Sequence, residues 1–289
     1  MNTNELLKKI KLIEIKTRGL TKHVFSGEYH SSFKGKGMAF SEVRDYHVGD
    51  EVRTIDWNVT ARFNTPFVKV FEEERELTVI LMIDVSGSSN FGTNEKTKKD
   101  LALELAAVFA FSAIANNDKV GAIFVSDQVE KYIAPAKGKR HALYILREMI
   151  EFKPQSLQTN LNEGLRFFRN ILKKRSIGFI ISDFMDSNSF TEGLKITRRK
   201  HDLVAIRLTD PAEAELPDLG MIQLYNAETG KKTWVNSSSA KTRQWHRDNY
   251  NTFEHNIKET FRRIGIDNTT VQTTDDFIPK LVQLFQTRK

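Results

Sequence analysis

The chain has 289 residues, of which 39% are hydrophobic and 28% are charged, proportions typical of a globular protein with a sizeable core. It contains no cysteine, which excludes disulfides and thiolate metal sites and agrees with a reducing compartment. The net charge is +7, and no apolar run approaches the ~20 residues of a membrane span. We therefore expect a cytoplasmic protein without a span of its own, any membrane association being made through a partner.

Residues 1–75 are expected to form an N-terminal helix and a small lobe. An amphipathic helix is predicted at 4–16, a Gly- and Ser-rich loop at 26–37 and a strand at 67–71. Between them, acidic and basic residues alternate with large apolar ones, which predicts partly buried ion pairs that order the lobe. If Trp57 is buried there, its replacement by alanine costs roughly 3–5 kcal/mol. On the surface it would cost less than about 1 kcal/mol.

Residues 76–289 are expected to form one α/β domain. Strands are predicted at 77–83, 120–125, 129–133, 177–181, 203–208 and 269–273, and helices at 100–116, 140–150, 161–172, 190–199, 240–264 and 277–285. The strand at 129–133 is expected to form a hairpin with its predecessor, and 220–235 a second hairpin. This alternation predicts a mostly parallel central sheet of the Rossmann type, with helices on both faces.

Oxygen-bearing side chains follow the apolar strand at 77–83. Asp84, Ser86 and Ser88 are spaced two apart, so their oxygens can point the same way from an extended chain. Open α/β sheets bind ligands at the carboxyl ends of their strands, and three hard oxygen donors suit Mg²⁺. The alternative is an ordinary polar turn in which Ser88 or Ser89 caps the next element.

Two further positions would complete a metal shell. Asp183 ends the strand at 177–181 as Asp84 ends its own, and Thr159 lies in a polar loop before that strand. Two carboxylates balance the charge of a divalent cation, and octahedral geometry leaves at least one position open or filled by water. Such an ion is expected to attract an external carboxylate, and the strand-end carboxylates are expected to face solvent.

These positions resemble the metal-ion-dependent adhesion site of von Willebrand factor A domains, whose pattern is Asp-x-Ser-x-Ser, a later Thr and then an Asp after another strand. In this sequence the pattern falls, in order, on Asp84, Ser86, Ser88, Thr159 and Asp183. The resemblance implies a von Willebrand factor A-like fold that binds Mg²⁺, Mn²⁺ or Ca²⁺. It also implies that the open metal position captures an acidic residue of a partner protein.

The N-terminal lobe resembles a more specific signature, that of the domain-of-unknown-function 58 family. The similar residues are Gly-Met-Ala-Phe-Ser-Glu-Val-Arg-Asp-Tyr at 37–46, Gly49-Asp50, Arg53, Ile55-Asp56-Trp57 and Ala61-Arg62. Those bacterial proteins join the signature to an A-like domain and are commonly encoded beside MoxR-type AAA+ ATPases. The resemblance implies a non-enzymatic adaptor that works with such an ATPase or its client proteins, and it brings no catalytic residue.

Two other functions are open alternatives. Asp84 would be the nucleophile of a Mg²⁺-dependent phosphohydrolase or phosphotransferase, but Ser86 stands where haloacid-dehalogenase-type phosphatases need an acid. The segment 231–263 carries 8 Lys or Arg against 3 Asp or Glu, which would suit nucleic acid. A solvated helix face explains that charge more simply, so no nucleic-acid partner is expected.

Overall fold

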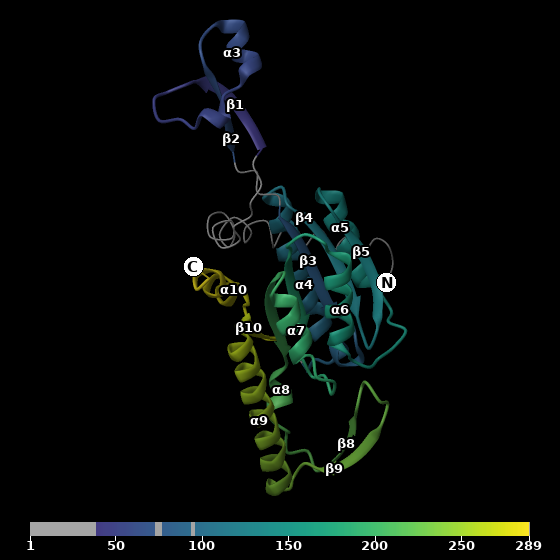
Figure 1. Ribbon diagram of the computed structural model, residues 1–289. Coiled ribbons are helices and arrows are strands. Elements are labelled where there is room, and N and C mark those ends of the chain that lie inside the picture. The colour runs from purple at the N-terminus through teal and green to yellow at the C-terminus, as the bar shows by residue number, and fades with distance from the viewer. Residues whose placement is uncertain (1–38, 73–76, 94–95, 289) are drawn as a thin grey trace. The chain divides into compact units, whose positions relative to one another are not determined.

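The computed structural model describes residues 39–72, 77–93 and 96–288 (Figure 1). The chain divides into two compact units, a smaller one at Phe33–Leu77 and a larger one that contains the chain from Thr78 onward. The helix expected at 4–16 and the loop expected at 26–37 lie outside the described residues. A search of the described residues for helices with the length and hydropathy of a membrane span finds none.

The smaller unit is built on two antiparallel strands, β1 (Ala39–Asp45) and β2 (Phe67–Glu72). A 3-10 turn, η1 (Val52–Thr54), and a short helix, α3 (Trp57–Phe63), lie between them in sequence. The helix begins where the Asp56 carboxylate accepts hydrogen bonds from two backbone N–H groups of its first turn, at 3.0 and 3.2 Å. Of these elements, the sequence predicted only the second strand.

Side chains in the smaller unit are mostly exposed. Within 42–69, Val68 is the single buried residue. Trp57 is 67% exposed, so of the two positions considered for its ring, the surface position is the one observed. So short a segment encloses little volume, and a ring at the start of a seven-residue helix is therefore left at its surface.

The larger unit is organised around a six-stranded sheet of order β10-β7-β6-β3-β4-β5. Its strands are β3 (Thr78–Asp84), β4 (Lys119–Val125), β5 (Val129–Ala136), β6 (Ile177–Ser182), β7 (Asp202–Thr209) and β10 (Asp267–Gln272). All neighbours are parallel except β5, which pairs antiparallel with β4 as the hairpin prediction required. Within this sheet the chain passes first through β3 and then through β4 and β5 on one side of it. The later strands β6, β7 and β10 follow on the other side of β3. The end of β3 is therefore the topological switch point, where open α/β sheets bind ligands.

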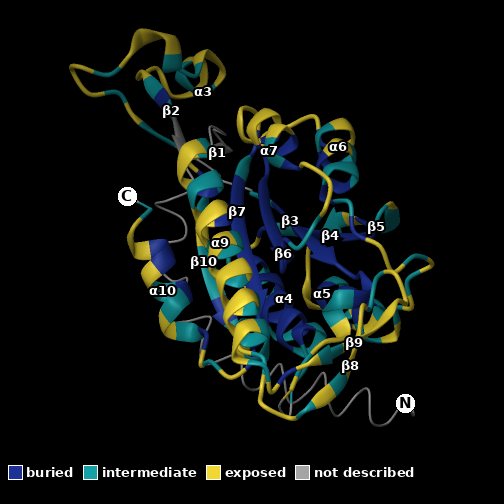
Figure 2. Cartoon of the chain, turned by 90° about the horizontal axis from the view of Figure 1, so that it is seen from below, coloured by how far each residue is buried: buried dark blue, intermediate teal, exposed yellow. Residues whose placement is uncertain are grey.

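Helices cover both faces of this sheet, as predicted (Figures 1 and 2). One layer consists of α6 (Leu161–Ile171), α7 (Thr191–Arg198) and α9 (Ala240–Ile264), and the other of α4 (Lys98–Ala115), α5 (Lys139–Glu151) and α10 (Ile278–Gln286). Ile80 and Met82 of β3 face the first layer. On the other face, Phe179 of β6 stacks on Phe109 of α4 with 4.1 Å between ring centroids. In Figure 2 the four inner strands, β6, β7, β3 and β4, form a continuous buried layer between helices whose outer sides are exposed.

The connections carry four smaller elements: η2 (Gly87–Asn90), α8 (Pro211–Ala214), β8 (Met221–Tyr225) and β9 (Lys232–Asn236). The last two pair antiparallel as a separate two-stranded sheet, which confirms the hairpin predicted at 220–235. The long polar helix α9 ends at Gly265, whose φ of 72° is the left-handed conformation that glycine adopts at helix ends. Both bounds of α9 agree with the sequence prediction.

Candidate metal-binding site

Asp84, the last residue of β3, is the centre of the candidate site. One carboxylate oxygen, Oδ1, accepts a hydrogen bond from the Ser86 N–H at 2.9 Å, and Oδ2 accepts one from the Ser182 hydroxyl at 2.6 Å. The residue is only 7% exposed, so the expectation that it faces solvent is wrong. Because β3 lies in the middle of the sheet, the ends of β4 and β6 flank its carboxyl end on both sides.

The two serines of the motif lie beside each other at the start of η2. Their hydroxyl oxygens are 3.1 Å apart, with Ser86 buried and Ser88 half-buried. Two neighbouring ligands of an octahedral Mg²⁺, each about 2.1 Å from the ion, are separated by about 3.0 Å. The two hydroxyls share a hydrogen bond, and their spacing also matches that of adjacent positions around a small hard cation.

Asp183 follows β6 at the same edge of the sheet and is 4% exposed. Its Oδ2 accepts a hydrogen bond from the Lys98 ammonium at 2.6 Å, and the same ammonium donates to Glu213 at 2.6 Å. Burial by itself would lower the pKa of Lys98, but the negative charges of the two carboxylates outweigh it and raise that pKa. The group is therefore a buried cation within the candidate site.

Sequence reasoning missed Lys98, although a signal for its position was present. Thr97 and Asp100 form a capping box, in which each side chain bonds the other residue's backbone N–H. That box starts α4 at Lys98, two residues earlier than predicted, and so places the lysine in the first turn of a helix that follows the β3 loop.

Thr159 is buried in the loop before α6, and its hydroxyl donates to Glu228 Oε1 at 2.7 Å. The loop is tied to the motif because the Gly87 N–H donates to the Leu157 carbonyl at 2.9 Å. The Asn188 side chain, which follows β6, donates to the Thr159 carbonyl at 3.1 Å. Three segments distant in sequence thus meet at one edge of the sheet, as the predicted site requires.

Negative charge exceeds positive charge at this edge. Asp84, Asp183, Glu213 and Glu228 contribute four carboxylates. Two cations oppose them, the Lys98 ammonium and the buried Arg207 guanidinium, whose Nε donates to the Asp183 carbonyl at 3.2 Å, so the sum is −2 when all are ionised. Burial, and next the charge of Asp183, raise the pKa of Asp84 to about 6 despite its hydrogen bonds. Burial and the neighbouring aspartates likewise raise the pKa of Glu228. Carboxylates in this state are stabilised by an added cation.

The predicted ligands thus fit a hard divalent cation by their chemistry. All five offer oxygen, and two of them carry charge. Among the described residues, at this site as well as elsewhere, no group of three or more His, Cys, Asp or Glu side chains is arranged so that it could hold a metal ion. The candidate set differs from such a group because three of its five members are hydroxyls. Metal binding at this site stays a prediction.

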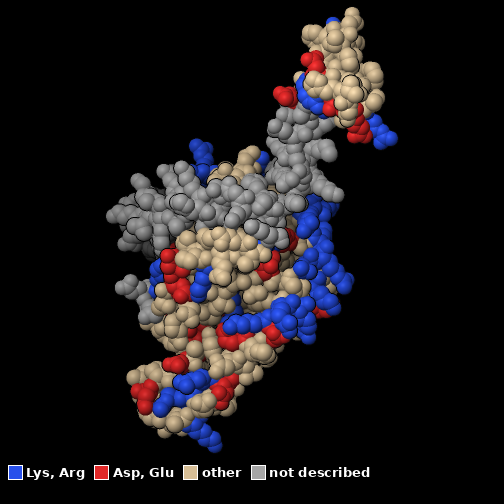
Figure 3. Space-filling model, turned by 90° about the vertical axis from the view of Figure 1, so that its left-hand side faces the viewer, with Lys and Arg blue, Asp and Glu red and all other residues tan. Residues whose placement is uncertain are grey.

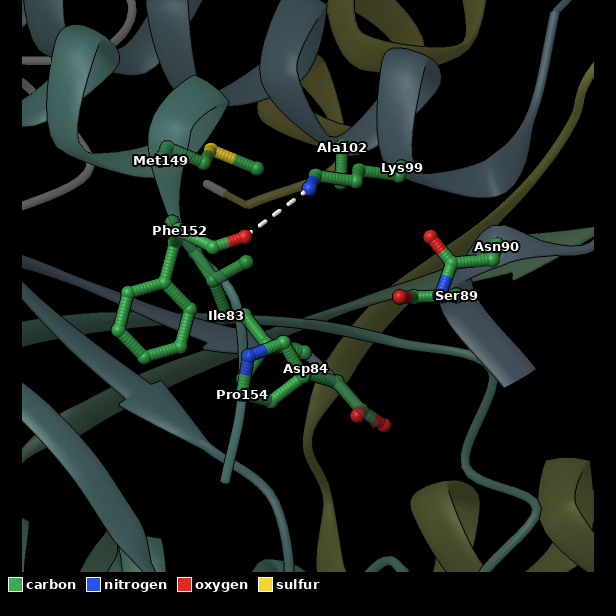
Figure 4. Close-up of a pocket in the computed structure, with 10 residues that line it drawn as sticks. Ile83, Asp84, Ser89, Asn90, Lys99, Ala102, Met149, Phe152 and Pro154 are labelled. Carbon is green, nitrogen blue, oxygen red and sulfur yellow. Dashed lines mark hydrogen bonds between the residues drawn. The ribbon is translucent and has the colours of Figure 1, made fainter. Parts of the chain in front are cut away.

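A small pocket lies beside the site, between β3, α4 and α5 (Figure 4). Its walls include Ile83, Ala102, Met149 and Phe152, whose carbonyl accepts a hydrogen bond from Lys99 at 3.3 Å. In Figure 4 the Asp84 carboxylate points away from Lys99 and Met149. The pocket has room for about one water molecule, so we assign no ligand to it.

The basic segment 231–263 falls largely on α9, where many of its charges are paired. Ion pairs join Arg243 to Asp218, Arg247 to Glu215, Lys258 to Glu254 and Arg262 to Glu259. Figure 3 shows Lys and Arg gathered on one face of the larger unit with Asp and Glu among them. This interleaving favours a solvated helix face over a continuous phosphate-binding surface.

The strand order, the single antiparallel edge strand and the oxygen cluster at the switch point define a von Willebrand factor A-like α/β protein. The profile of DUF58, a family described as proteins of unknown function, matches residues 42–256, and the chain belongs to this family. An uncharacterised protein of Mycobacterium tuberculosis is 27% identical over 282 residues, which are 97% of this chain and 89% of that protein.

Two solved structures match parts of this chain. An aerotolerance-related membrane protein from Bacteroides fragilis has a TM-score of 0.50 and 13% identity, covering 73% of this chain and 99% of that one. The VWA domain of SpRpn10 has a TM-score of 0.39 and 10% identity, covering 72% and 94% of the two chains. At 13% identity, the match to the Bacteroides fragilis protein speaks for the fold alone, and the function has to be argued from the site.

Proposed function

We propose that the chain is a non-enzymatic, metal-dependent adaptor that binds an acidic residue of a partner protein through the edge of its central sheet. The observation that carries this proposal is the convergence of Asp84, Ser86, Ser88, Thr159 and Asp183 from three loops at the switch point. The excess negative charge there supports it, because a divalent cation would offset it.

Each residue has a distinct part in this proposal. Ser86 and Ser88 offer two adjacent hydroxyl ligands, Asp84 and Asp183 supply the negative charge, and Thr159 closes the set from the third loop. When bound, Mg²⁺, Mn²⁺ or Ca²⁺ would supply an open coordination position for a carboxylate from outside. Both oxygens of Asp84 already accept hydrogen bonds within the protein, which favours a charge-holding role over that of a nucleophile.

We further propose that the partner is a MoxR-type AAA+ ATPase or one of its client proteins. Support for this comes from the family to which the chain belongs, whose signature residues at 37–62 resemble those of proteins encoded beside such ATPases. A partner of this kind would present an exposed Asp or Glu to the metal site.

Isothermal titration with Mg²⁺ tests the metal step. The unmodified chain should bind one equivalent, and Asp84→Asn should weaken binding by about tenfold or more, because a charged ligand becomes neutral. Asp248→Asn, which alters an exposed carboxylate on α9, is the matched control and should bind as the unmodified chain does. Equal affinity in all three proteins, or no binding in any, would overturn the metal site.

Capture from native lysate tests the partner step. Tagged chain in Mg²⁺, the same chain in EDTA, and Asp84→Asn in Mg²⁺ are compared by mass spectrometry. An AAA+ ATPase or its clients should appear in the first sample alone. The same partners in all three samples would show that this edge of the sheet does not mediate binding.

A further inference from the structure

The hairpin β8–β9 places its own carboxylate at the candidate metal site. Glu228 lies in the turn between the strands, and its Oε1 accepts the hydrogen bond of the Thr159 hydroxyl at 2.7 Å. Thr159 is 4% exposed and is itself one of the predicted metal ligands. A side chain bonded to this hydroxyl therefore lies beside the predicted ligand set, next to the position that the proposed function assigns to a partner's acidic residue.

Backbone packing shows that the tip of the hairpin is seated closely on the motif loop. A β-carbon added to Gly87, between the two motif serines, would lie 2.4 Å from the carbonyl oxygen of Ala227 and 2.8 Å from its carbonyl carbon. Contacts as short as these are not tolerated between a methyl group and backbone. Gly87 thus allows the residue before Glu228 to rest directly against the loop that carries Ser86 and Ser88.

The turn itself is ordered in a way that presents Glu228. Asn226 Oδ1 accepts hydrogen bonds from the N–H groups of Glu228 and Thr229, at 3.0 and 2.9 Å. The Asn226 N–H donates to the Lys231 carbonyl at 2.9 Å. These bonds fix the backbone of the turn whether or not the tip is in contact with the site.

The two strands of the hairpin, in contrast to its tip, make few packing contacts with the rest of the larger unit. Met221 and Tyr225 of β8 and Trp234 of β9 are 61%, 59% and 63% exposed. At the base, Ser237 is buried, and its N–H and hydroxyl both donate to the Gly220 carbonyl. In Figure 1 the hairpin is a ribbon that stands apart from the central sheet. It is therefore held at its base and its tip, and release of the tip would disturb few other contacts.

We propose that the β8–β9 hairpin is an internal occupant of the candidate site, with Glu228 taking the place of a partner's carboxylate until a partner displaces it. This inference rests on the proposed function, because it assigns a regulator to the same acid-binding position. The partner it fits is a protein that offers an exposed Asp or Glu and must compete with a carboxylate tethered nearby. Tethering gives Glu228 a high effective concentration, so weak or incidental acidic surfaces are excluded.

The test measures how tightly a small carboxylate binds to the full chain in saturating Mg²⁺. The probe is a capped single aspartate, N-acetyl-Asp-N-methylamide, followed by NMR titration, with the capped asparagine as the neutral comparison. Glu228→Ala should bind the aspartate probe about tenfold more tightly than the unmodified chain, since the tethered competitor is gone. Glu228→Gln, which keeps the shape and removes the charge, should fall between them. Thr229→Ala, at the exposed neighbouring turn residue, should match the unmodified chain.

A second measurement follows the hairpin directly. Amide hydrogen exchange across residues 221–236, in Mg²⁺, should quicken when an excess of probe is added to the unmodified chain, because displacement frees the tip. In Glu228→Ala the exchange should already be fast and should not respond to the probe.

The outcomes separate the two proposals. Asp84-dependent Mg²⁺ binding together with equal probe affinity in the unmodified chain and Glu228→Ala would overturn the hairpin's role and leave the metal site intact. Absence of Asp84-dependent Mg²⁺ binding would overturn both. A gain in probe affinity that appears in Thr229→Ala as well would also overturn the assignment, because it would trace the effect to the turn and not to the carboxylate.

Discussion

Two aspartates, one in each unit, show how differently the same side chain behaves in this molecule. Asp50 of the smaller unit receives a bidentate hydrogen bond from Arg44, at 2.7 and 2.8 Å, which together with the His47 N–H lowers its pKa to about 2. Asp84 of the larger unit accepts two short hydrogen bonds, yet burial and the charge of Asp183 raise its pKa to about 6. Hydrogen bonding decides the first case and loss of water the second.

The comparison teaches that density of charge in the sequence is a poor guide to where charge is buried. Residues 37–62 mix acids and bases closely, yet their Arg44–Asp50 ion pair is only partly buried, as the sequence predicted, with side chains 41% and 19% exposed. The buried cluster draws its members from separate segments instead. Lys98 and Asp183, with side chains 2% and 3% exposed, are 85 residues apart.

Of the changes that test this contrast between buried and exposed ion pairs, Lys98→Met should have the largest effect on the free energy of unfolding. Removing the ammonium leaves Asp183 and Glu213 without their shared partner in a buried place, which should destabilise the fold by roughly 3–5 kcal/mol. Urea unfolding in EDTA measures it. The control is Lys96→Met, which breaks a pair whose lysine side chain is 39% exposed and should cost less than about 1 kcal/mol. Equal losses would refute the claim that burial separates the two kinds of pair.

A change of pH should alter the free energy of unfolding by a smaller amount, and the contributions of Asp84 and Asp50 should change in opposite directions. The folded-state pKa of Asp84, about 6, lies above the ~3.9 of an unfolded chain, so protonation favours the folded state. Its contribution should be greatest below about pH 4 and should fall, by on the order of 2–3 kcal/mol, as pH rises through about 6. The folded-state pKa of Asp50 is lowered, so its contribution is present above about pH 4 and is lost as pH falls towards 2.

Carboxyl NMR titration in EDTA measures both pKa values, and urea unfolding at pH 4 and pH 7 measures the linkage. Part of the loss of stability between pH 4 and pH 7 is caused by ionisation of Asp84, and Asp84→Asn should remove that part. An Asp84 pKa near 4 would show that the carboxylate is solvated, and it would weaken the case for a buried site in need of a cation.

The smallest effect is expected from Trp57→Ala. A side chain that is 67% exposed has little burial to lose, so the free energy of unfolding of the smaller unit should change by less than about 1 kcal/mol. Val68→Ala, at a residue 2% exposed in the same unit, should cost about 1–3 kcal/mol. Hydrogen exchange across residues 42–69 reports both. A larger loss for Trp57→Ala than for Val68→Ala would contradict the exposed position of the ring.

The sequence determined the layered architecture of the larger unit because its signals are local. Runs of apolar residues predicted four of the six strands of the central sheet, and alternation of apolar and polar residues predicted the other two, at 129–133 and 269–273. Apolar spacing predicted the six long helices within a few residues of their ends. The positions of Asp84 and Asp183 at the ends of predicted strands also identified them as candidate site residues, because parallel strands end at the same edge of a sheet. In the smaller unit, β1 and α3 were missed because charge and aromatic content obscured the periodicity.

Only the tertiary structure decided what surrounds the candidate site. The Lys98–Glu213 and Thr159–Glu228 contacts join residues 115 and 69 positions apart, and no local pattern marks either pair. The same holds for burial: Asp84 was expected to face solvent and lies under neighbouring strand ends, whereas Trp57 is on the surface. Periodicity records which side of an element is apolar. Which charges meet, and which lose their water, depends on how the connections pack across the edge of the sheet.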